Sequence, residues 1–421
     1  MALVVAHYPT RSQTFVDRLV LALADEPSIS LTLAVSGALD RRAARRVLAD
    51  AWAAGRVRVV WVGGGRRSLT RAALGVWHAT IGLVRTPVAT ARSLDPRRYG
   101  RRAARLRVAA MLPLLRAVGP QHVVHAQFLG LGVDVAAACD ALGSARAGAG
   151  FAAPRLWASV RGADLTRAGA VTERDLTLLR RAGVGLLPVS ASLAEALVAR
   201  GVAAERIRIV PSGLDVEAIA FAPYAERPAS DVWRLAFVGR LVPKKGLDVL
   251  LRALALLEDS GAERPWRLEV VGDGPLAGRW RALAAEVGIA DRVDFRGAVA
   301  PADALTALRG ADTVVVPSRT GPDGDAEGVP NVAKEAMAVG TVVVASDHGG
   351  LAEAIADGRT GYLFAEGAVE ACAATLRRCL ADRARWPEVA GAAREAVARR
   401  YGIRAMLQPL VDAYRDATAS A

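Results

Sequence analysis

Short apolar segments, each ended by glycine or a polar turn, alternate with amphipathic helical segments along almost the whole chain. Near-continuous apolar strands between helices are typical of parallel sheets that are covered by helices on both faces. The pattern therefore predicts an α/β protein with doubly wound sheets. The expected strands are 3–7, 57–62, 122–128, 156–160, 184–190 and 207–212 in the first half, and 234–239, 267–272, 293–297, 313–318, 341–346 and 361–364 in the second.

The length of 421 residues exceeds what one hydrophobic core usually serves, so we expect two domains. The pattern predicts an N-terminal Rossmann-like domain over 1–214, a polar linker over 215–232, and a C-terminal Rossmann-like domain over 233–390. A C-terminal helical segment, 391–421, is expected to pack back on the N-terminal domain. Parallel sheets bind ligands at the carboxyl ends of their strands. Two such sheets facing a central cleft therefore predict an active site between the domains.

The cysteines and the N-terminal residues indicate the cellular compartment in which the protein is expected. Cys139, Cys372 and Cys379 show no metal-ligand spacing, and such a set suits a reducing environment. The first residues enter an apolar strand directly, without the basic and apolar regions of a signal peptide. No apolar run is long enough to predict a membrane span. We therefore expect a cytoplasmic protein.

The segment 56–116 holds 14 arginines and one acidic residue, Asp95, and accounts for the whole net charge of +13. One interpretation is a solvated basic face in an arginine-rich chain. The other is a surface that meets anionic lipid or a phosphorylated acceptor, on the inner face of the cell membrane. Apolar positions in 73–84 and 106–115 are interleaved with arginines, as in a helix lying in a membrane interface. Nucleic acid is the weaker partner, because no nucleic-acid motif is present.

The stretch "VGRLVPKKGLDVLL" follows an expected strand and opens an amphipathic helix. It brings Arg240, Lys244 and Lys245 near a helix N-terminus, where free N–H groups and the positive end of the helix dipole favour an anion. Two of the chain's three lysines lie here; the third is Lys334. The stretch therefore predicts a phosphate or diphosphate site, with an ordinary exposed basic turn as the alternative.

The stretch "GPDGDAEGVPNVAKEAMAVG" places several carboxylates between two apolar strands. A helix is expected to begin near Pro330, so that Glu327 lies just before it and Glu335 in its second turn. The amides of 328–332 would then point into the cleft. A carboxylate accepts two hydrogen bonds, which suits the hydroxyls of a sugar or ribose. The alternative is that Glu327 only caps the helix and Glu335 is solvated.

These motifs resemble those of the family 4 retaining glycosyltransferases. "EGVPNVAKEAMAVGTVVVASDHGG" is similar to the family's donor-site signature, and "VGRLVPKKGLDVLL" to its phosphate motif. "RIVPSGLDVEAIAF" resembles the interdomain segment, and "AHYPTRSQTFV" the N-terminus of a subgroup that builds exopolysaccharides, including colanic-acid-type enzymes. The resemblance is strongest over 205–365 and weak over 30–120. It implies the GT-B fold, with two Rossmann-like domains facing a cleft.

The resemblance also implies roles for single residues. A nucleotide-diphosphate sugar would bind the C-terminal domain, with its diphosphate on Arg240 and Lys245 and its ribose on Glu335. The backbone of 295–299, which includes Val299, would line the base. The donor sugar would be held by Glu327 and by the helix start, that is Gly328, Val329, Pro330 and Asn331.

One departure concerns the family's "HG-x-D" motif, which here reads "VRGADL" with Arg161, Gly162 and Asp164. An arginine stays protonated and cannot act as a base, but it can stabilise charge on a leaving phosphate. A structural ion pair between Arg161 and Asp164 is the alternative. The resemblance thus implies Glu327, Arg161 and Asp164 as catalytic residues.

The implied reaction is transfer of a hexose-type sugar to a glycan or lipid-linked acceptor, with retention and without cofactor. Asp323 and Asp325 resemble a metal-binding Asp-x-Asp, but they do not end a strand directly and the cations near Arg240 can neutralise a diphosphate, so we expect no metal. Transfer to a small aglycone and a nucleotide-sugar epimerase stay as alternatives. A phosphorylase would need a further lysine, and a non-enzymatic basic protein would leave the paired loops unexplained.

Overall fold

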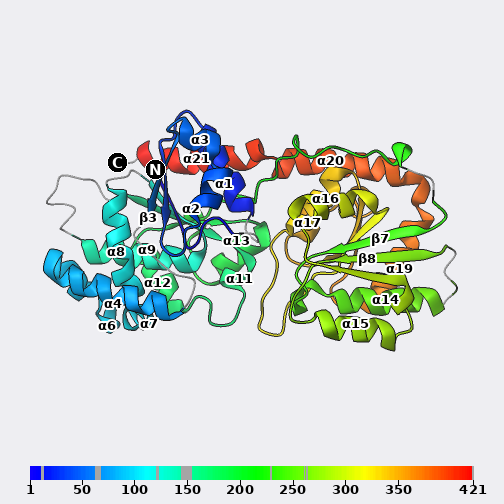
Figure 1. Cartoon of the computed structure of the whole chain (residues 1–421), viewed down its shortest axis with the longest axis horizontal. Coiled ribbons are helices and arrows are strands. Elements are labelled where there is room, and N and C mark those ends of the chain that lie inside the picture. Colours follow the sequence, from blue (N-terminus) through cyan, green and yellow to red (C-terminus); the bar gives the residue numbers. More distant parts are fainter. Residues whose placement is uncertain are drawn as a thin grey trace.

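The computed structural model describes residues 1–10, 14–61, 68–119, 123–143, 154–227, 230–259, 261 and 264–419. The described chain forms two lobes, each built on a parallel six-stranded sheet (Figure 1). The first sheet has the order β3–β2–β1–β4–β5–β6, with β1 (Ala2–Val5), β2 (Leu31–Val35), β3 (Val57–Trp61), β4 (Val123–Ala126), β5 (Arg155–Val160) and β6 (Gly185–Pro188). The second has the order β12–β11–β10–β7–β8–β9, with β7 (Trp233–Val238), β8 (Trp266–Val271), β9 (Val293–Gly297), β10 (Thr313–Val316), β11 (Val342–Asp347) and β12 (Tyr362–Ala365).

Helices cover both faces of the N-terminal sheet, because its strands are apolar on both sides. One face packs on α1 (Thr14–Asp25), α2 (Arg41–Val47), α3 (Ala49–Ala53) and α21 (Ile403–Ala419). The other packs on α8 (Arg107–Val118), α9 (Leu129–Leu142), α12 (Glu173–Arg181) and α13 (Ala191–Ala199). Four further helices, α4 (Ser68–Arg85), α5 (Pro87–Ser93), α6 (Pro96–Tyr99) and α7 (Arg101–Ala104), lie at one corner of this lobe (Figure 1).

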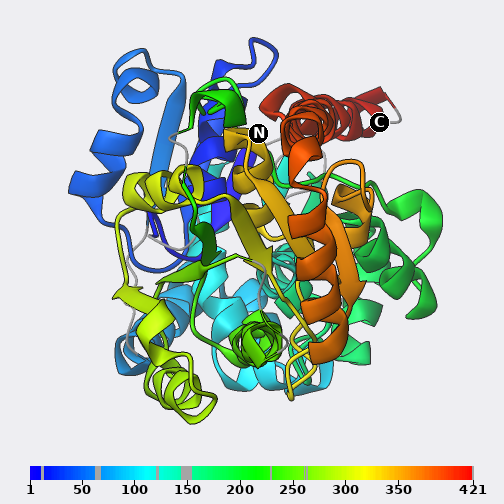
Figure 2. The same ribbon diagram turned by 90° about the vertical axis from the view of Figure 1, so that its right-hand side faces the viewer.

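The C-terminal sheet is covered in the same way, as Figure 2 shows with this lobe toward the viewer. One face packs on α14 (Leu247–Asp259), α15 (Ala277–Glu286) and α19 (Val369–Ala381). The other packs on α16 (Pro301–Gly310), α17 (Asn331–Val339), α18 (Leu351–Ala354) and α20 (Trp386–Tyr401). Among the described helices, none is both long enough and apolar enough to cross a bilayer. The two sheets confirm the predicted fold class.

The expected strands of the second half all form, whereas the first half differs in two places. The strand β2, "LTLAV", was not expected, although all five of its residues are buried. The segment 207–212 is not a strand: it makes one isolated bridge, between Ile207 and Leu186 of β6. Its chain leaves the sheet at Pro211, which has no N–H to donate, and continues toward the second domain.

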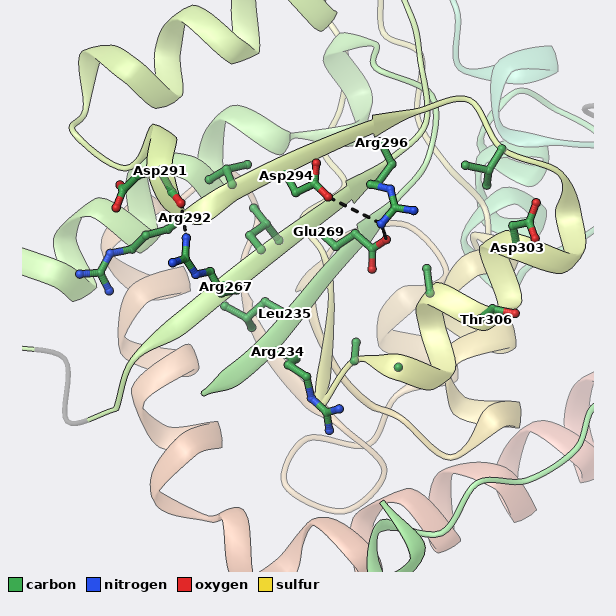
Figure 3. A pocket seen from close by; sticks show the side chains of 16 residues that line it. Arg234, Leu235, Arg267, Glu269, Asp291, Arg292, Asp294, Arg296, Asp303 and Thr306 are labelled. Atoms are coloured by element: carbon green, nitrogen blue, oxygen red, sulfur yellow. Dashed lines mark hydrogen bonds and ion pairs between the residues drawn. The ribbon is translucent and has the colours of Figure 1, made fainter. Parts of the chain in front are cut away.

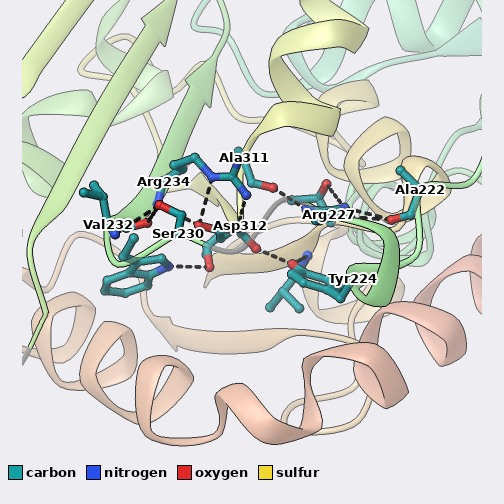
Figure 4. A network of polar contacts seen from close by, with 12 residues as sticks. Ala222, Tyr224, Arg227, Ser230, Val232, Arg234, Ala311 and Asp312 are labelled. Atoms are coloured by element: carbon teal, nitrogen blue, oxygen red, sulfur yellow. Dashed lines mark hydrogen bonds and ion pairs between the residues drawn. The ribbon is translucent and has the colours of Figure 1, made fainter.

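In the polar segment 215–232, the described residues Tyr224 and Arg227 attach the chain to the C-terminal domain (Figure 4). The hydroxyl of Tyr224 donates to the carbonyl of Asp312 and accepts the amide of Val342 at 2.9 Å. The guanidinium of Arg227 donates to the carbonyls of Ala222, Ala311 and Gly340. These contacts satisfy polar groups at the amino ends of β10 and β11, so this segment belongs structurally to the second lobe.

The chain passes between the lobes twice at one place. The amide of Leu214 donates to the carbonyl of Tyr401 at 2.7 Å, and Leu214 forms a bridge with Gly402. The C-terminal helical segment is divided here. Its first helix, α20, packs in the second lobe, and only α21 returns to the first, where Met406 and Tyr414 are buried.

Candidate functional site

The carboxyl ends of the two sheets face each other, and the acidic loop 319–330 runs between them (Figure 1). Glu327 belongs to this loop, and its side chain is 16% exposed. Its Oε1 atom lies 3.1 Å from Nζ of Lys244 and 3.2 Å from Nζ of Lys245. Burial disfavours the charged carboxylate, but Lys245 and Lys244 outweigh it and lower the pKa of Glu327 to about 2. The predicted phosphate loop and the predicted donor-sugar carboxylate therefore meet in one ion-paired cluster.

The backbone of Glu327 is held by a histidine of the loop after β11. Its amide donates to Nε2 of His348 at 3.3 Å, and Nδ1 of the same ring lies 2.8 Å from Oε2 of Glu366. Because Nε2 accepts from the amide of Glu327, Nδ1 is the ring nitrogen that donates to Glu366. Glu366 also accepts a hydrogen bond from the amide of Thr320 at 2.6 Å. Glu366 thus binds the start of the acidic loop directly and Glu327, near its end, through His348.

Both aspartates of the possible metal motif bind cationic side chains. Asp323 pairs with Arg167 at 2.9 Å, and Asp325 pairs with Arg167 at 3.0 Å and with Lys244 at 2.9 Å. Burial disfavours the charge on Lys244, but Glu327 and Asp325 raise its pKa above the ordinary value. The charge of this loop is thus neutralised within the protein by arginine and lysine.

The expected helix α17 begins at Asn331, with Pro330 as its N-cap, and Glu335 lies in its second turn as predicted. The carboxylate of Glu335 is not simply solvated: its Oε1 atom lies 3.1 Å from Nη2 of Arg18 on α1 of the opposite lobe. The neighbouring Lys334 is fully buried and donates to the carbonyl of Ser212 at 2.7 Å. Burial, with the positive charge of Arg161 nearby, lowers the pKa of Lys334 to about 7.

Arg161 follows β5 and faces the same cleft. Its guanidinium carbon lies 3.6 Å from the ring centre of Phe15, and Nη1 donates to Oγ of Ser212 at 2.5 Å. Burial lowers the pKa of Arg161 to about 10, which keeps it protonated near neutral pH. The carboxylate of Asp164 accepts the backbone amides of Arg161 and Leu129, at 3.1 and 3.4 Å, and burial raises its pKa to about 6. Asp164 therefore shapes the backbone of this loop, while the guanidinium contacts Ser212 and Phe15.

The other predicted donor residues are divided between the cleft and a groove. Gly328, Val329, Pro330 and Asn331 form the start of α17 beside Glu327. Arg240 is exposed and makes no ion pair with the described residues. Val299 is 38% exposed and lies on a groove of about 770 Å³ along β8, β9 and α16, lined by Glu269, Asp294 and Arg296 (Figure 3). This groove belongs to the second lobe alone and does not include the cluster around Glu327.

Several cleft residues were not predicted from the sequence: Arg18, Arg167, His348 and Glu366. Arg18, Arg167 and His348 each contact a residue of the predicted loops that is distant along the chain, and Glu366 contacts His348 in turn; Arg18 and Glu335, for example, are 317 residues apart. Such pairs have no spacing signal. The available signal lay in the loops themselves, because Arg167 lies two residues after "VRGADL" and His348 lies in "ASDHGG", at the end of the donor-site signature.

The basic segment is partly structural. Arg102 is 8% exposed and its guanidinium binds Asp134 and Asp175, each at 2.7 Å. The apolar positions of 106–115 are mostly buried on α8, so the expectation of an interfacial helix there is wrong. The apolar positions on α4 differ, since its surface exposes large hydrophobic side chains, which continue onto α5: Val76, Trp77, Leu83, Val84 and Val88.

Two Rossmann-like lobes, each with a parallel six-stranded sheet covered by helices, form the GT-B fold. The structure of HepE of Anabaena, in complex with UDP, has a TM-score of 0.68 over 99% of each chain, at 17% sequence identity. At this identity the likeness shows the fold.

The second lobe also resembles known proteins in sequence. Residues 224–397 match the family "Glycosyl transferases group 1". The amylovoran biosynthesis glycosyltransferase AmsK of Erwinia amylovora is 33% identical over 52% of this chain and 53% of its own length. The putative colanic acid biosynthesis glycosyltransferase WcaL of Salmonella typhimurium is 32% identical over 55% and 56%. The matched region thus spans about half the length of these relatives. The chain resembles group 1 glycosyltransferases of the colanic-acid type, as the motifs predicted.

Proposed function

We propose that the protein is a retaining glycosyltransferase that moves a hexose-type sugar from a nucleotide-diphosphate sugar to a glycan or lipid-linked acceptor in exopolysaccharide or cell-surface glycan synthesis. The observation that carries the proposal is the cluster of Glu327 with Lys244 and Lys245 at the edge of the C-terminal sheet. Relatives named for exopolysaccharide synthesis and a structural neighbour that binds UDP support it.

In this proposal the donor's diphosphate contacts Arg240 and Lys245. A phosphate on Lys245 takes one of the two cations that hold Glu327, whose carboxylate then accepts hydroxyls of the donor sugar. Glu335 accepts the ribose hydroxyls beside Arg18. The amides at the start of α17 add donors for an oxygen-rich ligand.

The acceptor hydroxyl attacks the anomeric carbon on the face from which the diphosphate leaves. The bond between that carbon and the phosphate oxygen breaks, and the departing phosphate oxygen takes the hydroxyl's proton. Arg161 stabilises the charge that develops on the leaving group, and no protein base is needed. The lysines and arginines supply the neutralising charge, so the reaction is proposed to need no metal.

The donor site is tested by calorimetry with nucleoside diphosphates after a thermal-shift screen of nucleotide sugars. Arg240→Ala, Lys245→Ala and Glu335→Ala are each expected to weaken binding by about 1.5–3 kcal/mol, the usual worth of a charge-assisted contact. Unchanged affinity in all three variants would show that the donor binds elsewhere. Product analysis without acceptor separates the alternatives, because an epimerase converts the nucleotide sugar alone, whereas a transferase needs a glycan or a small aglycone.

We further propose that the enzyme binds the inner face of the membrane through α4 and α5. Trp77 and Val84 are exposed on α4, and Arg97 and Arg101 are exposed on α6 and α7 of the same lobe. Each arginine near an anionic surface contributes about 1 kcal/mol, screened by salt. Co-sedimentation with phosphatidylglycerol vesicles should fall with salt, with Trp77→Ser, and with Arg97→Gln combined with Arg101→Gln. Equal binding to phosphatidylcholine vesicles would contradict the proposal.

A further inference from the structure

The loop after α11 (Gly162–Leu165) in the N-terminal lobe binds the acidic loop of the C-terminal lobe through ion pairs and hydrogen bonds. Nε of Arg167 lies 2.9 Å from Oδ2 of Asp323, and its Nη2 lies 3.0 Å from Oδ2 of Asp325. Two backbone contacts flank these ion pairs: the amide of Ala168 donates to the carbonyl of Asp323 at 2.8 Å, and the amide of Ala326 donates to Oγ1 of Thr166 at 2.9 Å. We refer to this set of contacts as the Arg167 clasp.

The two surfaces fit closely because each contributes a glycine where the backbone of the other approaches. A Cβ atom on Gly162 would lie 2.0 Å from the carbonyl oxygen of Ala326. A Cβ atom on Gly324 would lie 2.7 Å from the carbonyl oxygen of Thr166, and Gly324 has a φ of +77° that other residues rarely adopt. Both glycines therefore leave room for backbone from the opposite lobe, which indicates a built contact and not a chance approach of two surface loops.

The clasp continues into the site. Asp325, whose side chain is 9% exposed, binds Arg167 on one side and Lys244 on the other. The same Lys244 ammonium lies 3.1 Å from Glu327. An unbroken series of ion pairs thus leads from the N-terminal lobe to the carboxylate assigned to the donor sugar.

We propose that Arg167 is a positioning residue. When the two lobes close, Arg167 binds Asp325, and this contact holds Lys244 beside Glu327. While the clasp is formed, Asp325 has two cations and Lys244 is shared between Asp325 and Glu327. Without Arg167, Asp325 keeps Lys244 as its single described cation and draws it away from Glu327. The site is then complete only when the lobes are closed. This inference rests on the proposed function, because it takes Glu327 to be the carboxylate that binds the donor sugar.

The test compares Arg167→Gln and Arg167→Lys with Arg181→Gln, a matched control on an exposed arginine of α12 that makes no ion pair with described residues. Arg167→Gln should lower kcat about tenfold, equivalent to about 1.4 kcal/mol of transition-state stabilisation, and change the KM for the donor less than about twofold. Arg167→Lys should recover most of the rate, since one ammonium still reaches Asp325. A double-mutant cycle with Asp323→Asn measures the coupling across the clasp.

Small-angle X-ray scattering provides a readout that does not depend on turnover. Arg167→Gln should increase the radius of gyration, while Arg181→Gln should match the wild type and both should melt within a few degrees of it. If the wild type turns over no nucleotide sugar, the proposed function fails, yet scattering still tests the clasp. A wild-type kcat in Arg167→Gln, an equal loss in Arg181→Gln, or an unchanged scattering profile would each overturn the role of Arg167.

Discussion

The ammonium of Lys334 is predicted to lose its proton near neutral pH. Its side chain is fully buried, and the carbonyl of Ser212 accepts from it at 2.7 Å. Burial, with the positive charge of Arg161, lowers its pKa from the ordinary 10.5 to about 7. At neutral pH about half of the folded molecules would therefore carry a neutral amine between the lobes.

The lowered pKa of Lys334 has a defined effect on stability. In the unfolded chain the lysine keeps its proton up to about pH 10.5, whereas the folded chain releases it above about pH 7. The unfolded state thus binds more protons in this window, so the free energy of unfolding rises with pH there. Between about pH 7 and pH 9 the rise due to this one group amounts to about 2 kcal/mol. Lys334→Met keeps the length and removes the titrating group, so the variant should lack this rise.

The assay uses the fact that the chain has three lysines. Protein with ¹³C-labelled lysine should give three side-chain signals, and Lys334→Met identifies one of them. We expect that signal to titrate near pH 7, while the signal of Lys244 stays at its charged position, because the pKa of Lys244 is raised. Urea unfolding at the two pH values measures the stability increment in parallel. Three signals that all titrate above about pH 9, or equal increments in wild type and variant, would refute the reasoning.

Three further predictions concern other parts of the molecule. Tyr224→Phe should destabilise the protein by about 1–3 kcal/mol in urea unfolding, because it leaves a buried carbonyl and a buried amide without their partner. Gly162→Ala should reduce turnover while leaving the melting temperature of the second lobe intact, because its methyl group would force the lobes apart; Gly278→Ala, where a Cβ meets nothing within 4 Å, should have no effect on turnover. Turnover should survive EDTA, and complete loss restored by manganese would contradict metal independence.

The sequence predicted the sheets better than the contacts between the lobes. Strand periodicity is local, so all six expected strands of the second half formed. The sequence does not predict β2, although the strand is buried, because "LTLAV" carries no glycine or motif that distinguishes it from a helix segment. The segment 207–212 has the apolar character of a strand, but it leaves the sheet toward the second lobe after one bridge.

The site was predictable where chemistry lies on one loop, and not where it comes from two lobes. The start of α17 and the second-turn position of Glu335 followed from Pro330 and the helix pattern. The partners of these residues did not follow, because Arg18 and Arg167 reach them only once both lobes have folded. The sequence predicts that carboxylates of the acidic loop accept hydroxyls of a ligand, yet Asp323 and Asp325 bind cations of the protein itself.

The paired passages at Leu214 and Gly402 make the second lobe an insertion within the first. The stretch 215–401 begins and ends at adjoining points, joined by the bond from the Leu214 amide to the Tyr401 carbonyl, while β1 and α21 both belong to the other lobe. Recombination with both breakpoints at this joint would exchange the whole C-terminal lobe and leave the first core intact. Chimaeras built at this joint could therefore combine the donor preference of one homologue with the acceptor preference of another.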